Sequence, residues 1–388
     1  MKEDTKIVKA GRHPEDQFGA VNPPVYHVST VLMRTLDEFE HMRDTPEGTM
    51  VYGRRGTPTS FALDEAVAEL EGGAGCITSP SGLAAIAGAL LAFVKMGDHV
   101  LVTDSVYSPT RRFCDTVLAR LGVTTSYYDP LIGGRIAELI RDNTAVVFVE
   151  SPGSLTFEVQ DIPAIAAAAH ARGAKVLLDN TWASPLFFKP FEHGVDVSVQ
   201  AATKYIVGHS DAMLGTATAT AECLGPLRET VRALGYCAGP DDAYLGQRGL
   251  RTLGVRLRRH HESGLEVAQW LQKRSEVLRV MHPALPDDPG HALWRRDFTG
   301  ACGLFGFIME SGSRAQLAAF LEGCEHFGMG GSWGGFESLC IPTSPEKSRS
   351  ATQWAPGGQS MRLHIGLEDV GDLIEDLDRA FTRFHKTV

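Results

Sequence analysis

The sequence has no paired cysteine spacing and no strongly basic region. Seven cysteines are scattered over 388 residues without a CxxC pair, which is typical of reduced thiols rather than of a disulfide or zinc framework. The formal net charge is -10, and nucleic acids and anionic membranes bind clustered positive charge. We therefore expect neither of these partners and no metal site.

Long apolar runs are also lacking. The longest, LAAIAGALLAFV at 83–94, is too short to cross a bilayer and predicts a buried core helix. The start of the chain, MKEDTKIVKAGRHPED, is charged throughout and has neither the apolar core nor the cleavage site of a secretory signal. From these absences we expect a cytoplasmic protein without a membrane span.

Nucleotide-binding fingerprints are missing too, because neither GxGxxG nor GxxxxGK[ST] occurs at a strand-to-helix turn. From residue 61 onward, short β-rich runs alternate with helical patterns. This alternation predicts an α/β fold with a mainly parallel sheet and helices on both faces. We expect an N-terminal arm (1–60) that reaches a neighbouring subunit, an α/β domain (61–255) and a smaller α+β domain (256–388).

Ligands of such sheets bind beyond the carboxyl ends of the strands, and two of these ends suit parts of one ligand. The turn SPSG (79–82) leads into a helix near Leu83, and the free N–H groups of a helix start bind phosphate. The alternative is an ordinary Ser-capped helix. Asp179 ends the strand AKVLLD, where a carboxylate either caps a helix or keeps a ring nitrogen protonated.

Two further strand ends carry a tyrosine and a lysine. Tyr107 follows HVLVT and is either a surface turn residue or a ring that stacks on a flat ligand. Lys204 lies between SVQAAT and YIV, where little favours exposure. Desolvation lowers the pKa of a lysine, and the neutral amine condenses with an aldehyde to form a Schiff base. Phosphate site, carboxylate, stacking ring and amine together predict pyridoxal 5′-phosphate (PLP) as cofactor.

The order of motifs along the chain agrees with this interpretation. They include YGRRGTPT (52–59), ELEGGAGC (69–76), DNTWA (179–183), QAATKYIVGHSDAM (200–213), SWGGFES (332–338) and RLHIGLEDV (362–370). With these motifs the sequence resembles the Cys/Met-metabolism family of PLP-dependent enzymes over nearly the whole chain. The resemblance implies the aspartate-aminotransferase fold (PLP fold type I) and a homotetramer built from two close dimers.

The resemblance also implies roles for individual residues. Lys204 is the Schiff-base lysine, Asp179 the partner of the ring nitrogen, and Tyr107 the ring that stacks on the cofactor; Lys204, Tyr107 and Tyr52 are the implied catalytic residues. The remaining implied cofactor contacts are Gly82, Leu83, Thr203 and, reaching the phosphate in the neighbouring subunit, Tyr52 and Arg54.

The implied substrate site lies in the C-terminal part of the chain. Arg362 would clamp the substrate carboxylate as a planar fork, assisted by Ser332, with Trp333 and Gly331 beside them. Gly331 stands where β-acting relatives carry tyrosine and γ-acting relatives carry glutamate. The surrounding stretch GMGGSWGGF (328–336) is either a mobile loop or a tight one.

The implied reaction is a β-elimination on an amino-acid thioether. It splits L-cystathionine, and other cysteine S-conjugates, into a thiol such as homocysteine, pyruvate and ammonia, with the amine of Lys204 removing the α-proton. Two alternatives stay open. One is a γ-lyase or γ-synthase on the same fold, for which 2-oxobutanoate is the diagnostic keto acid. The other is a non-catalytic regulatory protein that binds PLP.

Overall fold

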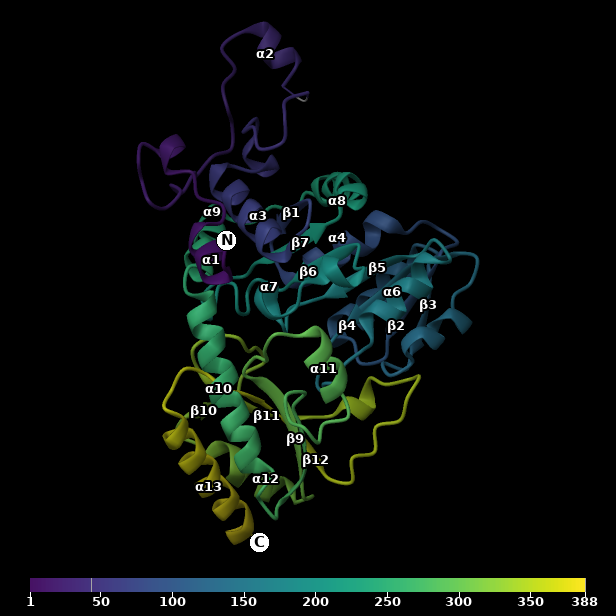
Figure 1. Ribbon diagram of the computed structural model, residues 1–388, viewed down its shortest axis with the longest axis vertical. Helices are drawn as coiled ribbons and strands as arrows, with labels where there is room; N and C mark the ends of the chain where they lie inside the picture. Colours follow the sequence, from purple (N-terminus) through teal and green to yellow (C-terminus); the bar gives the residue numbers. More distant parts are fainter. Residues whose placement is uncertain (43, 388) are drawn as a thin grey trace.

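Two sheets form the framework of the computed structural model, which describes residues 1–42 and 44–387 (Figure 1). The larger sheet has seven strands in the order β1 (Gly75–Ser79), β7 (Gly215–Ala219), β6 (Val197–Gln200), β5 (Lys175–Asp179), β4 (Thr144–Glu150), β2 (His99–Thr103) and β3 (Thr124–Tyr128). The smaller sheet has five, in the order β10 (Phe327–Gly328), β11 (Ser338–Thr343), β12 (Gln359–His364), β9 (Leu304–Met309) and β8 (Val277–Met281).

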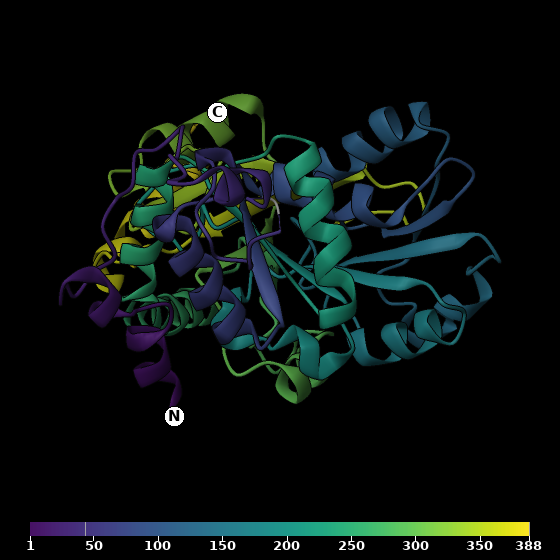
Figure 2. The same ribbon diagram turned by 90° about the horizontal axis from the view of Figure 1, so that it is seen from above.

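Helices cover both faces of the larger sheet (Figure 2). The helices associated with it are α3 (Pro58–Glu71), α4 (Gly82–Phe93), α5 (Ser108–Phe113), α6 (Ile162–His170), α7 (Ser184–Phe187), α8 (Ala221–Ala233) and α9 (Pro240–Leu250). The predicted α/β architecture is confirmed, and strands β3, β2, β4, β5 and β6 are parallel. The exception is β7, which is antiparallel to both β6 and β1.

Strand β4 shows why the sheet is buried on both sides. Val146 and Phe148 belong to the core formed with α4 and α8, whereas Val147 and Val149 belong to the core formed with α3 and α6. Successive side chains of a strand point to opposite faces. A strand covered on both faces is therefore a continuous apolar run, as AVVFVE is in the sequence.

The smaller sheet packs against a third core. Helices α10 (Leu253–Leu271), α12 (Arg314–Glu322) and α13 (Val370–Lys386) contribute to this core. Helix α11 (His291–Asp297) instead packs Leu293 and Trp294 against a core of the larger sheet. Leu373, Leu377 and Phe381 repeat at helical spacing and are buried in the third core, which confirms the amphipathic closing helix. Helix α10 connects the two sheets (Figure 1) and runs through the predicted boundary at 255/256. The domain limits stay a prediction.

The N-terminal arm contains one segment that its sequence did not indicate. Helix α1 (Glu3–Lys9) docks on the body of the same chain, where Ile7 is buried and Arg251 Nη1 donates to the carbonyl oxygens of Ile7 and Ala10 at 3.0 and 2.9 Å. Beyond it, the segment with α2 (Leu36–Glu40) projects away from the body (Figure 1). This segment exposes large apolar side chains, which are Leu32, Leu36 and Phe39.

Two absences bear on the expectations from sequence. No helix within residues 1–42 and 44–387 combines the length and apolarity that a membrane crossing requires. All seven cysteines are present as free thiols, five of them buried.

Candidate active site

Four strand ends of the larger sheet meet at the edge nearest the smaller sheet. Strand β2 leads to Tyr107, β4 ends at Glu150, β5 ends at Asp179 and β6 leads to Lys204. Glu150 and Asp179 are direct neighbours in the register of β4 and β5. The structure thus brings three predicted residues to one edge, as parallel strands do, and adds Glu150, which the sequence interpretation missed.

Lys204 points toward the loop between β10 and β11. Its Nζ donates a hydrogen bond to Ser332 Oγ and lies 5.5 Å from the ring centre of Trp333. Burial and the nearby positive charge of Arg362 lower the pKa of Lys204 to about 8, although Asp179 acts in the opposite direction. A useful fraction of this amine is therefore neutral near neutral pH, unlike that of a solvated lysine.

Asp179 is buried and fixed by its second neighbour along the chain. Its Oδ1 accepts from the backbone N of Thr181 at 3.0 Å and from Thr181 Oγ1 at 2.5 Å. Burial raises the pKa of Asp179, while the Thr181 bonds and Lys204 lower it. Thr181 Oγ1 also accepts from the backbone N of Ala201 at 2.8 Å. Thr181 thereby joins the end of β5 to the segment that carries Lys204.

Tyr107 lies beside two carboxyl groups and a guanidinium. Its backbone N donates to Glu150 Oε2 at 2.7 Å. Burial, together with Asp179 and Glu150, raises the pKa of Tyr107, and Arg362 lowers it. The phenol is therefore neutral at neutral pH. Burial and the proximity of Asp179 also raise the pKa of Glu150 well above its usual range.

Arg362, on β12, contacts the loop that contains Ser332. Its Nη2 donates to the carbonyl oxygens of Ser332 at 3.0 Å and of Gly330 at 3.4 Å. Burial lowers the pKa of Arg362 to about 10, so the guanidinium still carries its charge at neutral pH. Lys204, Ser332, Trp333 and Arg362 are thus brought together from distant parts of the sequence.

The glycine-rich loop is tight at one end and open at the other. Gly334 has φ +84, and a Cβ atom there would lie 2.9 Å from Lys204 Cβ. Only glycine allows both that backbone conformation and that approach. A Cβ atom on Gly331 would meet nothing within 4 Å. The sequence left open whether this loop is mobile or tight, and around Gly334 it is tightly packed.

The start of α4 also adjoins the segment that carries Lys204. Ser81 Oγ accepts from the backbone N of Ala84, whereas the N–H groups of Gly82 and Leu83 make no hydrogen bond within the described part of the chain. A Cβ atom on Gly82 would lie 2.5 Å from Ala201 Cβ. This approach leaves no room for a side chain at position 82.

Thr203 uses its hydroxyl within the chain. Its Oγ1 donates to the carbonyl oxygen of Leu214 at 3.1 Å and accepts from the backbone N of Leu214 at 2.8 Å. Donation to a phosphate would require the hydroxyl to give up the Leu214 carbonyl. The implied phosphate contact of Thr203 stays a prediction.

Tyr52 and Arg54 lie apart from the Lys204 group. They line a cavity of about 1040 Å³, together with residues of the arm, α3 and α8. Arg54 Nη1 donates to the carbonyl oxygen of Arg232 at 3.0 Å. The lining residues of this cavity include neither Lys204 nor Arg362. Within one chain, the structure does not bring Tyr52 and Arg54 to the strand-end site.

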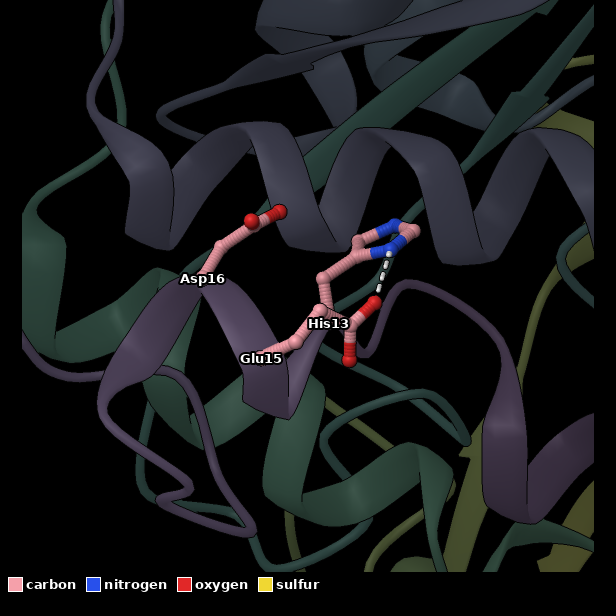
Figure 3. A group of neighbouring side chains, drawn as sticks. All are labelled: His13, Glu15 and Asp16. Carbon is pink, nitrogen blue, oxygen red and sulfur yellow. Dashed lines mark ion pairs between the residues drawn. The ribbon is translucent and has the colours of Figure 1, made fainter.

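A separate polar group lies on the arm, where Figure 3 shows the side chains of His13, Glu15 and Asp16. All three are exposed, and His13 Nδ1 lies 3.8 Å from Glu15 Oε1. His13 Nε2 lies 2.8 Å from a carboxylate oxygen of Glu65, whose hydrogen bond raises the pKa of His13. We interpret the group as exposed ion pairing that attaches this part of the arm to α3.

The sequence matches a protein family over residues 4–382, and that family is described as Cys/Met metabolism PLP-dependent enzyme. The chain belongs to this family. Membership makes PLP its cofactor. It also accounts for the combination of an amine, a buried carboxylate and an open helix start at one sheet edge.

Individual members of the family are similar to this chain over their full length. A putative cystathionine beta-lyase of Rhizobium johnstonii is 52% identical, with 97% of this chain and 95% of the relative covered. Cystathionine beta-lyase MetC of Escherichia coli is 49% identical, with 98% of each covered. Among solved structures, cystathionine gamma synthase of Xanthomonas oryzae pv. oryzae, in complex with aminoacrylate and cysteine, has a TM-score of 0.91 at 31% identity, with 100% of each chain covered.

Proposed function

We propose that this chain is a PLP-dependent carbon–sulfur β-lyase that splits L-cystathionine into homocysteine, pyruvate and ammonia, and that it accepts other cysteine S-conjugates. The observation that carries the proposal is the Lys204 amine, held beside Ser332 and Trp333 with Arg362 and Asp179 close by. The names of the two relatives at 49% and 52% identity support the choice of substrate.

The residues at the site fit PLP. The open amides of Gly82 and Leu83, at the positive end of α4, would hold the phosphate. Asp179 would pair with the ring nitrogen, Tyr107 would lie against the ring, and Lys204 would bind the aldehyde carbon. When bound, PLP supplies an electron sink for the α-carbon of the substrate.

Arg362 would hold the substrate by its α-carboxylate. Its guanidinium is a planar fork that matches a carboxylate with two parallel hydrogen bonds. In the structure its Nη2 donates to loop carbonyls, and a carboxylate is the stronger acceptor because it is charged. Binding at Arg362 would fix the end of the substrate next to the α-carbon.

Once the substrate amine has replaced it at the aldehyde carbon, the freed amine of Lys204 would take the α-proton on Nζ. A base is most effective when its pKa lies near the working pH, and burial brings the pKa of Lys204 to about 8. Ser332 Oγ, which accepts from Nζ, would keep the amine oriented. A thiolate leaves readily from the β-carbon because thiol pKa values are about 8.5, and the neutral phenol of Tyr107 would be available as a proton donor.

The two alternatives fit less well. A γ-lyase or γ-synthase shares the fold, and the structural relative named as a γ-synthase is 31% identical, whereas the relatives named as β-lyases are at 49% and 52%. A non-catalytic regulatory protein would have no need to keep Lys204, Asp179 and Arg362 together. The β-lyase proposal therefore accounts for more of the observations.

The assembly we propose is a homotetramer of two close dimers, in which the arm completes the site of the neighbouring subunit. Tyr52 and Arg54 line a large cavity beside the arm, and the lining of this cavity does not include Lys204 of their own chain. The arm also exposes Leu32, Leu36 and Phe39. Apolar side chains of this size are expected to be covered in an assembly.

The keto acid released from L-cystathionine tests the proposed function. We expect the purified enzyme to form pyruvate and homocysteine in equal amounts, because β-elimination breaks the bond at the cysteine half. Mass spectrometry of the products decides between the alternatives. Release of 2-oxobutanoate and cysteine would replace the proposal with γ-elimination, and no keto acid from any of a panel of cysteine thioethers would restore the regulatory protein.

Mixing of inactive variants tests the contribution of the arm to its neighbour. Lys204→Ala and Arg54→Ala chains, mixed and allowed to exchange subunits, should recover activity because each mixed dimer contains one site with neither lesion. The matched control is Lys204→Ala mixed with Asp179→Asn, since these two lesions belong to the same chain's site and leave none intact. Equal activity in both mixtures, with subunit exchange demonstrated, would place Arg54 in its own chain's site.

Substitution of Gly331 tests the width of the substrate site. Because a Cβ atom there meets open space, Gly331→Tyr should fit and should reduce kcat/KM for bulky cysteine thioethers about tenfold more than for small ones. Gly331→Ala is the control and should change the two classes equally. The same factor for bulky and small thioethers in Gly331→Tyr would show that this glycine does not set selectivity.

A further inference from the structure

The loop between β10 and β11 depends on Arg362 for part of its anchoring. Arg362 Nη2 donates to the carbonyl oxygens of Gly330 and Ser332, so the guanidinium holds the first half of this loop. The same guanidinium would bind the substrate carboxylate in the function proposed above. A loop that must keep Ser332 beside Lys204 during the reaction therefore needs a second anchor.

His364 has the geometry of that anchor. It lies on β12 two residues after Arg362 and is 1% exposed. Its Nε2 accepts from the backbone N of Gly334 at 3.1 Å, and its Nδ1 donates to the carbonyl oxygen of Glu337 at 3.0 Å. A neutral imidazole has one donor and one acceptor nitrogen. Both are used on the half of the loop that Arg362 does not hold.

The surroundings of His364 keep its ring neutral and in place. The ring centre lies 5.2 Å from that of His260, on α10, and 6.0 Å from that of Tyr205, the residue after Lys204. Burial and the nearby basic groups His260, Arg362 and Lys204 lower the pKa of His364 well below its usual range. Nε2 therefore remains an acceptor at neutral pH, and the bond from Gly334 persists.

We propose that His364 is a positioning residue that holds Ser332 and Trp333 against Lys204 while Arg362 binds the substrate carboxylate. The two residues that it holds lie immediately before Gly334, so loss of the Gly334 bond frees them directly. This inference rests on the proposed function. It separates the two tasks of the strand: Arg362 binds the substrate, and His364 maintains the loop.

Two variants of matched size test this role in the holoenzyme. His364→Gln keeps one donor and one acceptor on its amide, whereas His364→Leu keeps the volume and loses both. We expect His364→Leu to raise the KM for L-cystathionine about tenfold, for two lost neutral hydrogen bonds, with a smaller change in kcat, and His364→Gln to recover most of the loss. A His364→Leu enzyme with unchanged KM and kcat, or a His364→Gln enzyme equally impaired, would overturn the proposal.

Hydrogen exchange provides a readout that does not depend on turnover. L-Alanine supplies the α-carboxylate for Arg362 but has no leaving group on its β-carbon. With L-alanine bound, peptides covering 330–337 should exchange faster in His364→Leu than in wild type. Peptides covering His99–Thr103 in β2, a strand of the other sheet, are the internal control and should be unchanged. Unchanged exchange at 330–337 would overturn the proposal, whereas failure of the wild type to release pyruvate from L-cystathionine would overturn the proposed function alone.

If the His364→Leu chain does not fold, the proposal can still be tested on the wild-type enzyme. Neutron diffraction at neutral pH locates the proton of the imidazole. The proposal requires that proton on Nδ1, with Nε2 bare and facing the N–H of Gly334. A proton on Nε2 would contradict it.

Discussion

Partial burial of the Lys204 amine between the two sheets is the constraint on which the site depends. The lysine comes from the larger sheet, whereas Ser332, Trp333 and Arg362 come from the loop and strand of the smaller one. Burial disfavours the charged form of an amine, and it lowers the pKa of Lys204 to about 8. The packing that assembles the site is therefore also the cause of the amine's reactivity.

Contacts away from the site fix the position of the two sheets relative to each other. Asp104, just after β2, accepts from the backbone N of Ser350 at 2.9 Å and of Thr352 at 2.8 Å. Arg111 pairs with the same carboxylate at 2.6 Å, so a segment of the C-terminal part is fixed near Tyr107. On another side, Trp182 Nε1 donates to the carbonyl oxygen of Leu304 at 2.8 Å. Such buried polar contacts specify one relative position.

Sequence reasoning found the strand ends and three of the side chains that meet there, but it missed features that depend on contacts between distant segments. The strand HVLVT and the strand end at Asp179 were predicted as they occur, because a doubly covered strand is a continuous apolar run. Glu150 gave no signal, since its role comes from the neighbouring strand and from Tyr107. Strand β10 has only two residues and no pattern of its own, and helix α1 is held by Arg251, more than 240 residues away.

Competitive labelling of Lys204 tests the central claim most directly. After removal of PLP, trace acetylation at a series of pH values reports the neutral fraction of each amine. It is quantified by mass spectrometry, with the exposed Lys273 as reference for the reagent. Burial at the sheet boundary predicts a half-maximal rate at Lys204 near pH 8, because only the neutral amine reacts. A midpoint at the ordinary lysine value of about 10.4 would contradict the account.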